Sequence, residues 1–352
     1  MHRQENSKAW KPETEYVVKS EASEIAVIGA GSWGTALAIQ LGRAGQHPTL
    51  WGREPEVIAA LEAKRCNSVF LPDIPLPESV RINADLDAVV GQHSDLLICV
   101  PSHVFRAVLE SIKPNLVNGA RIAWATKGFE LSSGKLPHQV AHEALGVEVP
   151  LAVVSGPTFA TEVGLGLPTA MTVAATNADY ADELAWRFSD DNFRAYTSTD
   201  MVGVEVGGAV KNVLAIATGL SDGLGFGANA RVALITRGLA EMTRLGVAIG
   251  AQTDTFMGLS GMGDLVLTCT DNQSRNRRMG LALAAGKSVE ETAREIGQVV
   301  EGVKAAAAVR KVAADLQVEM PICEQVYQLL YEGISVKEAI QSLMQREVKS
   351  EA

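Results

Sequence analysis

A short apolar run followed directly by a glycine-rich turn constrains the fold of this chain more than any other feature. The segment "IAVIGAGSWGTALA" contains the spacing Gly29-Ala-Gly31-Ser-Trp-Gly34. In a strand–turn–helix unit, the first glycine makes the tight turn, the second lets backbone approach a pyrophosphate, and the third allows close helix–strand packing. The N–H groups of the following helix can bind phosphate. The pattern predicts a dinucleotide-binding site, in preference to a glycine-rich turn without a ligand.

Runs of apolar residues alternate with amphipathic stretches in the first half of the chain. One such stretch, "WGTALAIQLGRAG", ends in Gly45, a residue type typical of helix C-termini. Strand–helix–strand alternation predicts a parallel sheet with helices on both faces. The runs expected to form strands are "EIAVIGA", "HPTLWGR", "DLLICVP", "RIAWATKG", "LAVVSGP" and "AMTVAAT".

The pattern changes near residue 198. Beyond it lie long alanine-rich stretches, and Ser288 and Ser335 each begin a capping-box motif typical of helix starts. We therefore predict an α/β protein with an N-terminal Rossmann-type doubly wound sheet over residues 23–198 and an all-helical C-terminal domain over residues 199–346. Residues 1–22 are polar and charged, and we expect them to form a flexible N-terminal extension.

Charge and cysteine usage limit the possible functions. The formal net charge of −10 disfavours nucleic-acid binding, because phosphate backbones are held by dense lysine and arginine surfaces. The uncharged stretch from Ile25 to Leu41 approaches the length of a membrane span, but glycines and polar residues interrupt it, so no span is expected. The first 20 residues lack the apolar core of a secretory signal. The four cysteines stand far apart without a metal-ligand spacing, which predicts no metal site and fits a reducing cytoplasm.

The end of the second predicted strand bears on the choice of dinucleotide. A carboxylate at this position binds the adenosine ribose of NAD, whereas an arginine can pair with the 2′-phosphate of NADP. The chain has Arg53 close to this position, followed by Glu54. We therefore expect NADPH to be preferred, with NAD possible. The alternative is that Arg53 is an ordinary surface charge or stacks on adenine.

Polar residues also stand at other strand ends. The carboxyl ends of the strands line the ligand crevice of a doubly wound sheet, and Lys127, Gly156 and Thr158 follow two of these strands. Lys127 therefore either places a cation near a bound phosphate or belongs to a surface turn. Its position alone favours neither interpretation.

A second polar cluster lies in "GLSGMGDLVLTCTDNQSRNRRMG". It contains a single early carboxylate, Asp264, and the run Ser274-Arg275-Asn276 just before an apolar helix. Hydroxyl, guanidinium, amide and helix N-terminal N–H groups together suit a phosphate or another anion. The two arginines that follow directly either add to this positive site or form a solvated basic turn.

Lys211 stands inside the run "GGAVKNVLAIATGLSDGLGFG", among small and branched apolar residues of a predicted helix. Burial of an ammonium group costs free energy and lowers its pKa. A lysine whose pKa approaches the working pH is a useful proton donor and acceptor. The alternative is a core-helix lysine whose ammonium group extends to water.

Together these motifs resemble the bacterial NAD(P)-dependent glycerol-3-phosphate dehydrogenases, over residues 24 to 345. The Lys211 segment is the most specific part of the match. The resemblance implies a Rossmann domain followed by a helical domain of the 6-phosphogluconate-dehydrogenase-like type. It further implies a homodimer that interconverts dihydroxyacetone phosphate and sn-glycerol 3-phosphate for phospholipid synthesis.

The resemblance also implies roles for individual residues. Lys211 would be the catalytic acid/base, and Asp264 would either orient its ammonium group or bind a substrate hydroxyl. The implied substrate-binding residues are Lys127, Gly156, Thr158, Lys211, Asp264, Ser274, Arg275 and Asn276. The implied cofactor-binding residues are Gly29, Gly31, Ser32, Trp33, Gly34, Arg53, Lys127, Ala160, Arg275, Val299 and Glu301.

Two other functions remain open at this point. A relative with the same fold could act on a non-phosphorylated 3-hydroxy acid or a ketopantoate-like substrate, although the Ser274–Asn276 cluster favours a phosphate. A non-catalytic nicotinamide-binding redox sensor would keep the Gly29–Gly34 turn but would have no need of Lys211 or the arginines.

Overall fold

The computed structural model describes residues 24–345, so the extension predicted at residues 1–22 lies outside the described part. In the first half, the strands are β1 (Ile25–Ile28), β2 (Thr49–Trp51), β3 (Cys66–Asn67), β4 (Leu71–Pro75), β5 (Arg81–Asn83), β6 (Asp95–Ile98), β7 (Arg121–Trp124), β8 (Leu151–Ser155), β9 (Thr169–Ala175) and β10 (Phe193–Ser198). The helices between them are α1 (Ser32–Arg43), α2 (Pro55–Lys64), α3 (Leu86–Gln92), α4 (Ser102–Ile112), α5 (Pro137–Leu145), α6 (Ala160–Leu165) and α7 (Ala178–Phe188).

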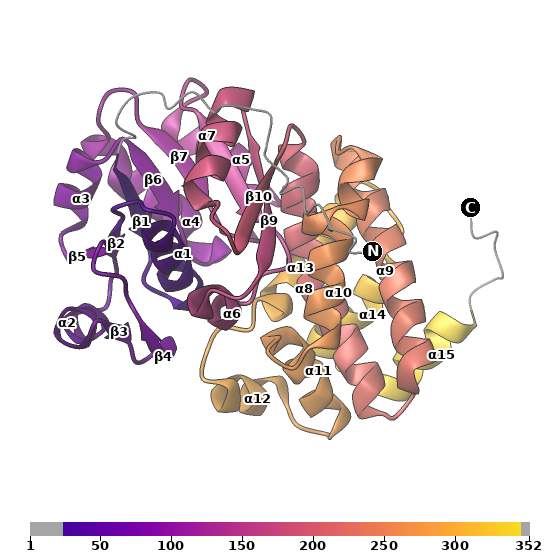
Figure 1. Cartoon of the computed structure of the whole chain (residues 1–352). Helices are drawn as coiled ribbons and strands as arrows, with labels where there is room; N and C mark the ends of the chain where they lie inside the picture. The colour runs from indigo at the N-terminus through magenta and orange to yellow at the C-terminus, as the bar shows by residue number, and fades with distance from the viewer. Residues whose placement is uncertain (1–23, 346–352) are drawn as a thin grey trace, which may run out of the picture.

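One eight-stranded sheet organises this half of the molecule, in the order β10-β9-β8-β7-β6-β1-β2-β5 (Figure 1). The strands from β8 to β5 in this order pair in parallel. The strands β9 and β10 pair in parallel with each other, but β9 pairs antiparallel with β8. The prediction of a wholly parallel sheet is therefore wrong at this edge. The connection between β8 and β9 contains the short helix α6, which packs against α1.

Burial explains which strands could be recognised from the sequence as apolar runs. The strands β1, β6 and β8 are buried at every position, as expected for strands covered on both faces, and they read as continuous apolar runs. The strand β10 lies at the edge of the sheet and most of its residues are not buried, and β5 at the opposite edge has no buried residue. Their polar sequences concealed both edge strands from a search for apolar runs.

The second half is helical throughout its described residues. Its helices are α8 (Met201–Gly223), α9 (Gly227–Ile249), α10 (Asp264–Thr270), α11 (Arg275–Ala284), α12 (Val289–Ile296), α13 (Glu301–Asp315), α14 (Pro321–Tyr327) and α15 (Val336–Met344). Short helical turns at Thr253–Met257 and Leu259–Gly263 precede α10.

The helix α8 is the centre of this half. The helices α9, α10, α11, α13 and α14 all contact it, and it also contacts β8 and β9 of the sheet. By length and composition α8 could cross a membrane, but 94% of its most apolar stretch is buried inside the protein, which identifies it as a core helix. The helix that carries Lys211 therefore lies where the two halves of the molecule meet (Figure 1).

Candidate active site

The glycine-rich turn has the geometry that a bound dinucleotide needs. Gly29 has a φ of +126°, and a Cβ atom at this position would overlap the carbonyl oxygen of Cys99. A Cβ at Gly34 would overlap the Gly29 carbonyl, so α1 approaches the turn as closely as it does only because residue 34 is a glycine. Around Gly31, by contrast, no atom lies within 4 Å of an added Cβ, which leaves open space for a pyrophosphate.

The start of α1 has free hydrogen-bonding capacity in the same place. Gly31 caps the helix without a side-chain hydrogen bond, and Ser32 is the first helical residue. The indole Nε1 of Trp33 is buried and finds no hydrogen-bond partner among the described residues. A buried donor without a partner is uncommon in a folded protein, and a bound polar group would relieve its cost. The residues of this turn therefore fit a dinucleotide.

The other predicted cofactor residues are spread over several elements. Arg53 follows β2 with 79% of its side chain exposed, and its guanidinium lies 3.1 Å from Glu54. Ala160 is the first residue of α6, Val299 is exposed, and Glu301 is the first residue of α13. In the described part of the chain, the Arg53 side chain pairs with Glu54 and not with another predicted site residue.

Two lysines from different halves of the molecule share one buried carboxylate. Lys127, just after β7, places its Nζ 2.6 Å from Asp264 Oδ2, and Lys211 of α8 binds Oδ1 of the same side chain. The Asp264 side chain is 1% exposed. Lys211 also donates a hydrogen bond of 3.0 Å to Thr268 Oγ1. The structure thus brings together three residues that the sequence analysis had placed in separate motifs.

The charges of this cluster shift its pKa values in a consistent direction. The pKa of Lys211 is lowered to about 8: burial is the main cause, the Asp264 carboxylate partly opposes it, and the nearby Lys127 ammonium adds to the lowering. Burial by itself would raise the pKa of Asp264, but the two ammonium groups outweigh it and hold that pKa below its ordinary value. Asp264 is therefore an anion at neutral pH, and Lys211 is a cation close to its titration point.

The run before α11 is held by its own hydrogen bonds. Ser274 caps the helix by accepting a hydrogen bond of 3.2 Å from the backbone N–H of Arg277. Asn276 accepts one from the Gly302 N–H at 2.8 Å and donates one to Asn212 Oδ1 at 2.8 Å. Arg275, at the first helical position, donates only a long bond of 3.4 Å to Gln298. Of these side chains, Arg275 is the most available for an anion.

The idea of a positive site made by three neighbouring arginines needs a correction. The side chain of Arg277 is buried, forms an ion pair with Asp222 and donates a hydrogen bond of 3.0 Å to Asn272. Its positive charge is paired with Asp222 inside the helical half. The side chain therefore belongs neither to the predicted anion site nor to a solvated turn. Arg278 is exposed.

The loop after β8 lies next to the lysine cluster. Gly156 has a φ of +153°, and Thr158 donates a hydrogen bond of 3.2 Å back to the Gly156 carbonyl. Between them, Pro157 packs against the turn before Asp264, where a Cβ added at Gly263 would lie 3.5 Å from the proline ring. The loop thus forms part of the wall beside Asp264.

Two residues at the site escaped the sequence analysis. Asn212 follows Lys211 in the chain and connects Asn276 with Glu301, to which it donates a bond of 3.4 Å. Thr268 stands four residues after Asp264, a spacing that puts both side chains on one face of a helix. That spacing was a usable signal, but it required α10 to be recognised as a helix first.

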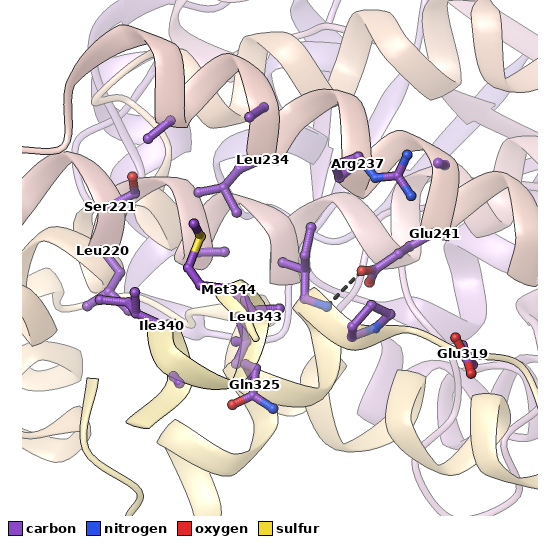
Figure 2. Close-up of a pocket in the computed structure, with 18 of the residues that line it drawn as sticks. Leu220, Ser221, Leu234, Arg237, Glu241, Glu319, Gln325, Ile340, Leu343 and Met344 are labelled. Carbon is purple, nitrogen blue, oxygen red and sulfur yellow. Dashed lines mark hydrogen bonds between the residues drawn. The ribbon is translucent and has the colours of Figure 1, made fainter. Parts of the chain in front are cut away.

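A separate cavity of about 1270 Å³ lies between α8, α9, α14 and α15 (Figure 2). Its lining is mainly apolar, and it includes none of the predicted site residues. Glu241, drawn in Figure 2, turns its carboxylate towards the start of α14 and accepts hydrogen bonds from the Ile322 and Cys323 N–H groups. The paired lysines and the glycine-rich turn lie elsewhere, so we place the active site there and not in this cavity.

Fold and site together are typical of one class of protein: a dinucleotide-dependent dehydrogenase in which a Rossmann-type sheet is followed by a helical half with a buried lysine on its core helix. Comparisons with known proteins agree. Residues 24–181 match the model of the N-terminus of NAD-dependent glycerol-3-phosphate dehydrogenase, and residues 200–341 match the model of its C-terminus. The chain belongs to the NAD-dependent glycerol-3-phosphate dehydrogenase family.

Individual relatives support the same assignment. The glycerol-3-phosphate dehydrogenase (NAD(P)+) of Aeromonas salmonicida is 59% identical over 329 residues, which cover 93% of this chain and 98% of the relative. The crystal structure of glycerol-3-phosphate dehydrogenase from Coxiella burnetii superposes with a TM-score of 0.89 at 47% identity, covering 92% of this chain and 99% of that one. A ketopantoate reductase from Ralstonia eutropha, at 18% identity and a TM-score of 0.57, with 91% of this chain and 99% of that one covered, shares the fold alone.

Proposed function

We propose that this protein interconverts dihydroxyacetone phosphate and sn-glycerol 3-phosphate, with Lys211 as the acid/base. The observation that carries the proposal is a buried lysine with a pKa near 8, held beside a second lysine by one carboxylate. NAD(P)H, when bound at the glycine-rich turn, would supply the hydride for the C2 carbonyl carbon. As the carbonyl oxygen gains negative charge, the Lys211 ammonium donates a proton to it, so that ketone, NAD(P)H and H⁺ give alcohol and NAD(P)⁺.

The lysine cluster is suited to this proton transfer in two ways. Asp264 and Thr268 fix the direction of the Lys211 ammonium, and Lys127 keeps the cluster at a net charge of +1. In a pocket largely shielded from water, this positive charge stabilises a developing alkoxide more strongly than it would in solution. In the reverse direction, the neutral amine of Lys211 accepts the proton of the alcohol.

A phosphate-bearing substrate is favoured by the start of α11. The Arg275 guanidinium, the free hydroxyl proton of Ser274 and the N–H groups of the helix N-terminus can all donate to phosphate oxygens. Asn276 keeps one amide hydrogen for the substrate. The loop with Gly156 and Thr158 would form another part of the pocket wall, beside Asp264. A ketopantoate-like substrate carries a carboxylate with two oxygens in place of a phosphate with three terminal oxygens, so it would leave some of these donors without an acceptor.

We assign most of the cofactor contacts to the dinucleotide-binding domain, residues 23–198, and the acid/base and most of the substrate contacts to the helical domain, residues 199–346. The pyrophosphate would lie at Gly29, Gly31 and the start of α1, supported by the open space at Gly31. The further cofactor contacts proposed are Ser32, Trp33, Gly34, Arg53, Lys127, Ala160, Arg275, Val299 and Glu301. Arg53 supports a preference for NADPH over NADH.

We also propose that the protein acts in the cytoplasm as a homodimer and supplies sn-glycerol 3-phosphate for phospholipid synthesis. The support for self-association is the exposed apolar surface of α9 and the turn before it, where Val232 is 61% and Phe226 48% exposed. Light scattering coupled to size-exclusion chromatography measures this directly, and a mass of one chain at micromolar concentration would contradict it.

The decisive experiment replaces Lys211 by methionine. Lys211→Met keeps the length and apolar packing of the side chain, and it should retain the fold and NADPH binding because the glycine-rich turn is untouched. The turnover number for dihydroxyacetone phosphate reduction should fall by about 10²–10⁴, the usual contribution of a positioned acid/base. NADPH oxidation is followed by absorbance, with and without dihydroxyacetone phosphate.

The controls are a melting curve and a fluorescence titration with NADPH. A folded, NADPH-binding variant with turnover near that of the wild type would make Lys211 a structural residue. A wild-type protein that binds NADPH but does not oxidise it with dihydroxyacetone phosphate would instead support a redox sensor.

A further inference from the structure

Glu205 connects the two halves of the molecule close to the lysine cluster. It lies in α8, and its side chain is 1% exposed. Its Oε1 accepts hydrogen bonds from Trp124 Nε1 at 3.2 Å and from the His138 backbone N–H at 2.9 Å, and its Oε2 binds His138 Nδ1. Trp124 ends β7 and His138 lies in the first turn of α5, so both partners belong to the sheet half.

Each of the two segments joined by Glu205, the end of β7 and the helix α8, leads to a lysine of the candidate active site. Trp124 stands three residues before Lys127, and Glu205 stands six residues before Lys211 on the same buried helix. Between them the Lys127 side chain lies against the backbone of α8: a Cβ added at Gly208 would lie 3.2 Å from Lys127 Cγ. The position of β7 on α8 therefore determines where Lys127 and Lys211 meet Asp264.

A buried carboxylate is a specific way to fix this position. An apolar contact would allow small shifts of β7 along α8, whereas the three bonds to Glu205 are satisfied in one arrangement only. Burial raises the pKa of Glu205, and the His138 ring opposes this effect, while Glu205 raises the pKa of His138 above its ordinary value despite burial. The only other titratable ring beside the pair is His142, which stacks edge-on against His138 with centroids 6.3 Å apart in the described structure.

We propose that Glu205 is a positioning residue for the reaction: by holding the end of β7 against α8, it sets the mutual position of Lys127 and Lys211 and keeps water away from them. This inference rests on the proposed role of Lys211 and adds a residue that touches neither substrate nor cofactor. A misplacement of reacting groups by about 1 Å can cost on the order of 100-fold in rate, so the effect should be visible in turnover.

The test compares Glu205→Ala, Glu205→Gln and a matched control, Glu241→Ala. Glu241 is also a buried glutamate of the helical half that accepts two backbone N–H bonds, but it faces the separate cavity of Figure 2. Its loss should therefore lower the melting temperature without affecting the lysine cluster. Glu205→Gln keeps an oxygen that can accept from Trp124 and His138 and should rescue the geometry.

The measured quantities are the melting temperature, NADPH affinity, and the pH dependence of turnover with dihydroxyacetone phosphate. For Glu205→Ala we expect roughly 10- to 100-fold lower turnover and unchanged NADPH affinity. The basic limb of its pH profile should move to higher pH, because water that enters the site reduces the burial of Lys211 and so raises its pKa. Glu205→Gln should stay within about threefold of the wild type, and Glu241→Ala should keep the wild-type pH profile.

Equal effects of Glu205→Ala and Glu241→Ala on turnover, or an unmoved basic limb in Glu205→Ala, would overturn the proposal. If Glu205→Ala does not fold, Trp124→Phe carries the test, because it removes one donor and keeps an aromatic ring against Phe105; a wild-type profile in that variant overturns the proposal. Lys211→Met separates failure of this inference from failure of the proposed acid/base. If Lys211 is the acid/base, this variant loses the basic limb of the pH profile, whatever the Glu205 variants show.

Discussion

At the scale of single residues, three charged side chains determine the electrostatics of the site, with one carboxylate held between two ammonium groups. Lys127 and Lys211 both bind Asp264, so neither ammonium group is fully neutralised and the cluster as a whole stays positive. A carboxylate shared by two cations is a stable buried arrangement, but the second cation weakens the hold of Lys211 on its proton. The same arrangement therefore anchors the lysine and activates it.

The pH dependence of turnover should reflect Lys211. Reduction of the ketone needs the ammonium form, so its rate should fall as the pH rises through about 8, and oxidation of the alcohol needs the amine and should rise over the same range. Lys127→Met removes the neighbouring positive charge and should move both limbs to higher pH. Steady-state rates from pH 6 to 10 measure this, and limbs that coincide in wild type and Lys127→Met would contradict the coupling.

Cofactor choice should depend on Arg53. Arg53→Ala should raise the KM for NADPH roughly tenfold and leave the KM for NADH nearly unchanged, because only NADPH carries the 2′-phosphate. The effect is expected to be modest, since the side chain is 79% exposed and its ion pairs are screened by water. Initial rates with both cofactors provide the measurement. A similar loss for both would assign Arg53 to adenine stacking or to the surface.

At the scale of elements, one helical turn carries much of the predicted substrate site. Ser274, Arg275 and Asn276 are the cap and the first two residues of α11, so a single change in that turn acts on all three. The hydrogen bonds of Asn276 to Asn212 and Gly302 connect the same turn with α8 and α13. The start of α11 would thus couple local helix stability to the proposed substrate binding.

Two equivalent helix caps allow that coupling to be measured. Ser274→Ala should destabilise the protein by about 1 kcal/mol, the usual contribution of an N-cap, and should also raise the KM for dihydroxyacetone phosphate. Ser288→Ala removes the corresponding cap of α12, where Ser288 accepts a bond from the Glu291 N–H, and should cost similar stability without a change in KM. Denaturant unfolding and steady-state kinetics are compared for both variants. Matching KM values would mean that the α11 turn does not bind substrate.

At the scale of the whole molecule, the proposed active site lies where the two halves meet. The sheet half provides Lys127 and the glycine-rich turn, and the helical half provides Lys211, Asp264 and the α11 turn. Several bonds cross this boundary, among them Lys127–Asp264, His138–Glu205 and a contact of 2.8 Å between Gln273 and Glu162. Catalysis therefore depends on how the halves are held together, as well as on the residues that each contributes.

The N-terminal segment should have no part in this arrangement. Deletion of residues 1–20 should leave turnover and melting temperature nearly unchanged, since the segment precedes β1 and has no apolar periodicity. Differential scanning fluorimetry and the NADPH assay on both proteins are sufficient. A drop of several degrees in the melting temperature would mean that Trp10 or Tyr16 packs against the body of the protein.

The sequence by itself determined the features that depend on near neighbours along the chain. The strand, turn and helix around Gly29 follow from residues within one short segment, and the capping box at Ser335 forms as its spacing predicts. The apolar surroundings of Lys211 already indicated a buried lysine, and burial is observed. The α/β half and the helical half were likewise predictable, because periodicity reports which face of each element is covered.

Only the tertiary structure decided which distant groups meet. Lys127 and Lys211 reach Asp264 across 137 and 53 positions of the chain, and nothing in either local pattern specifies that partner. The same holds for Arg277, whose charge is taken by Asp222, and for the reversal of β9. Ion pairs and strand direction are set by the packing of whole elements, whose energy is summed over many contacts far apart in sequence, so no short motif records them.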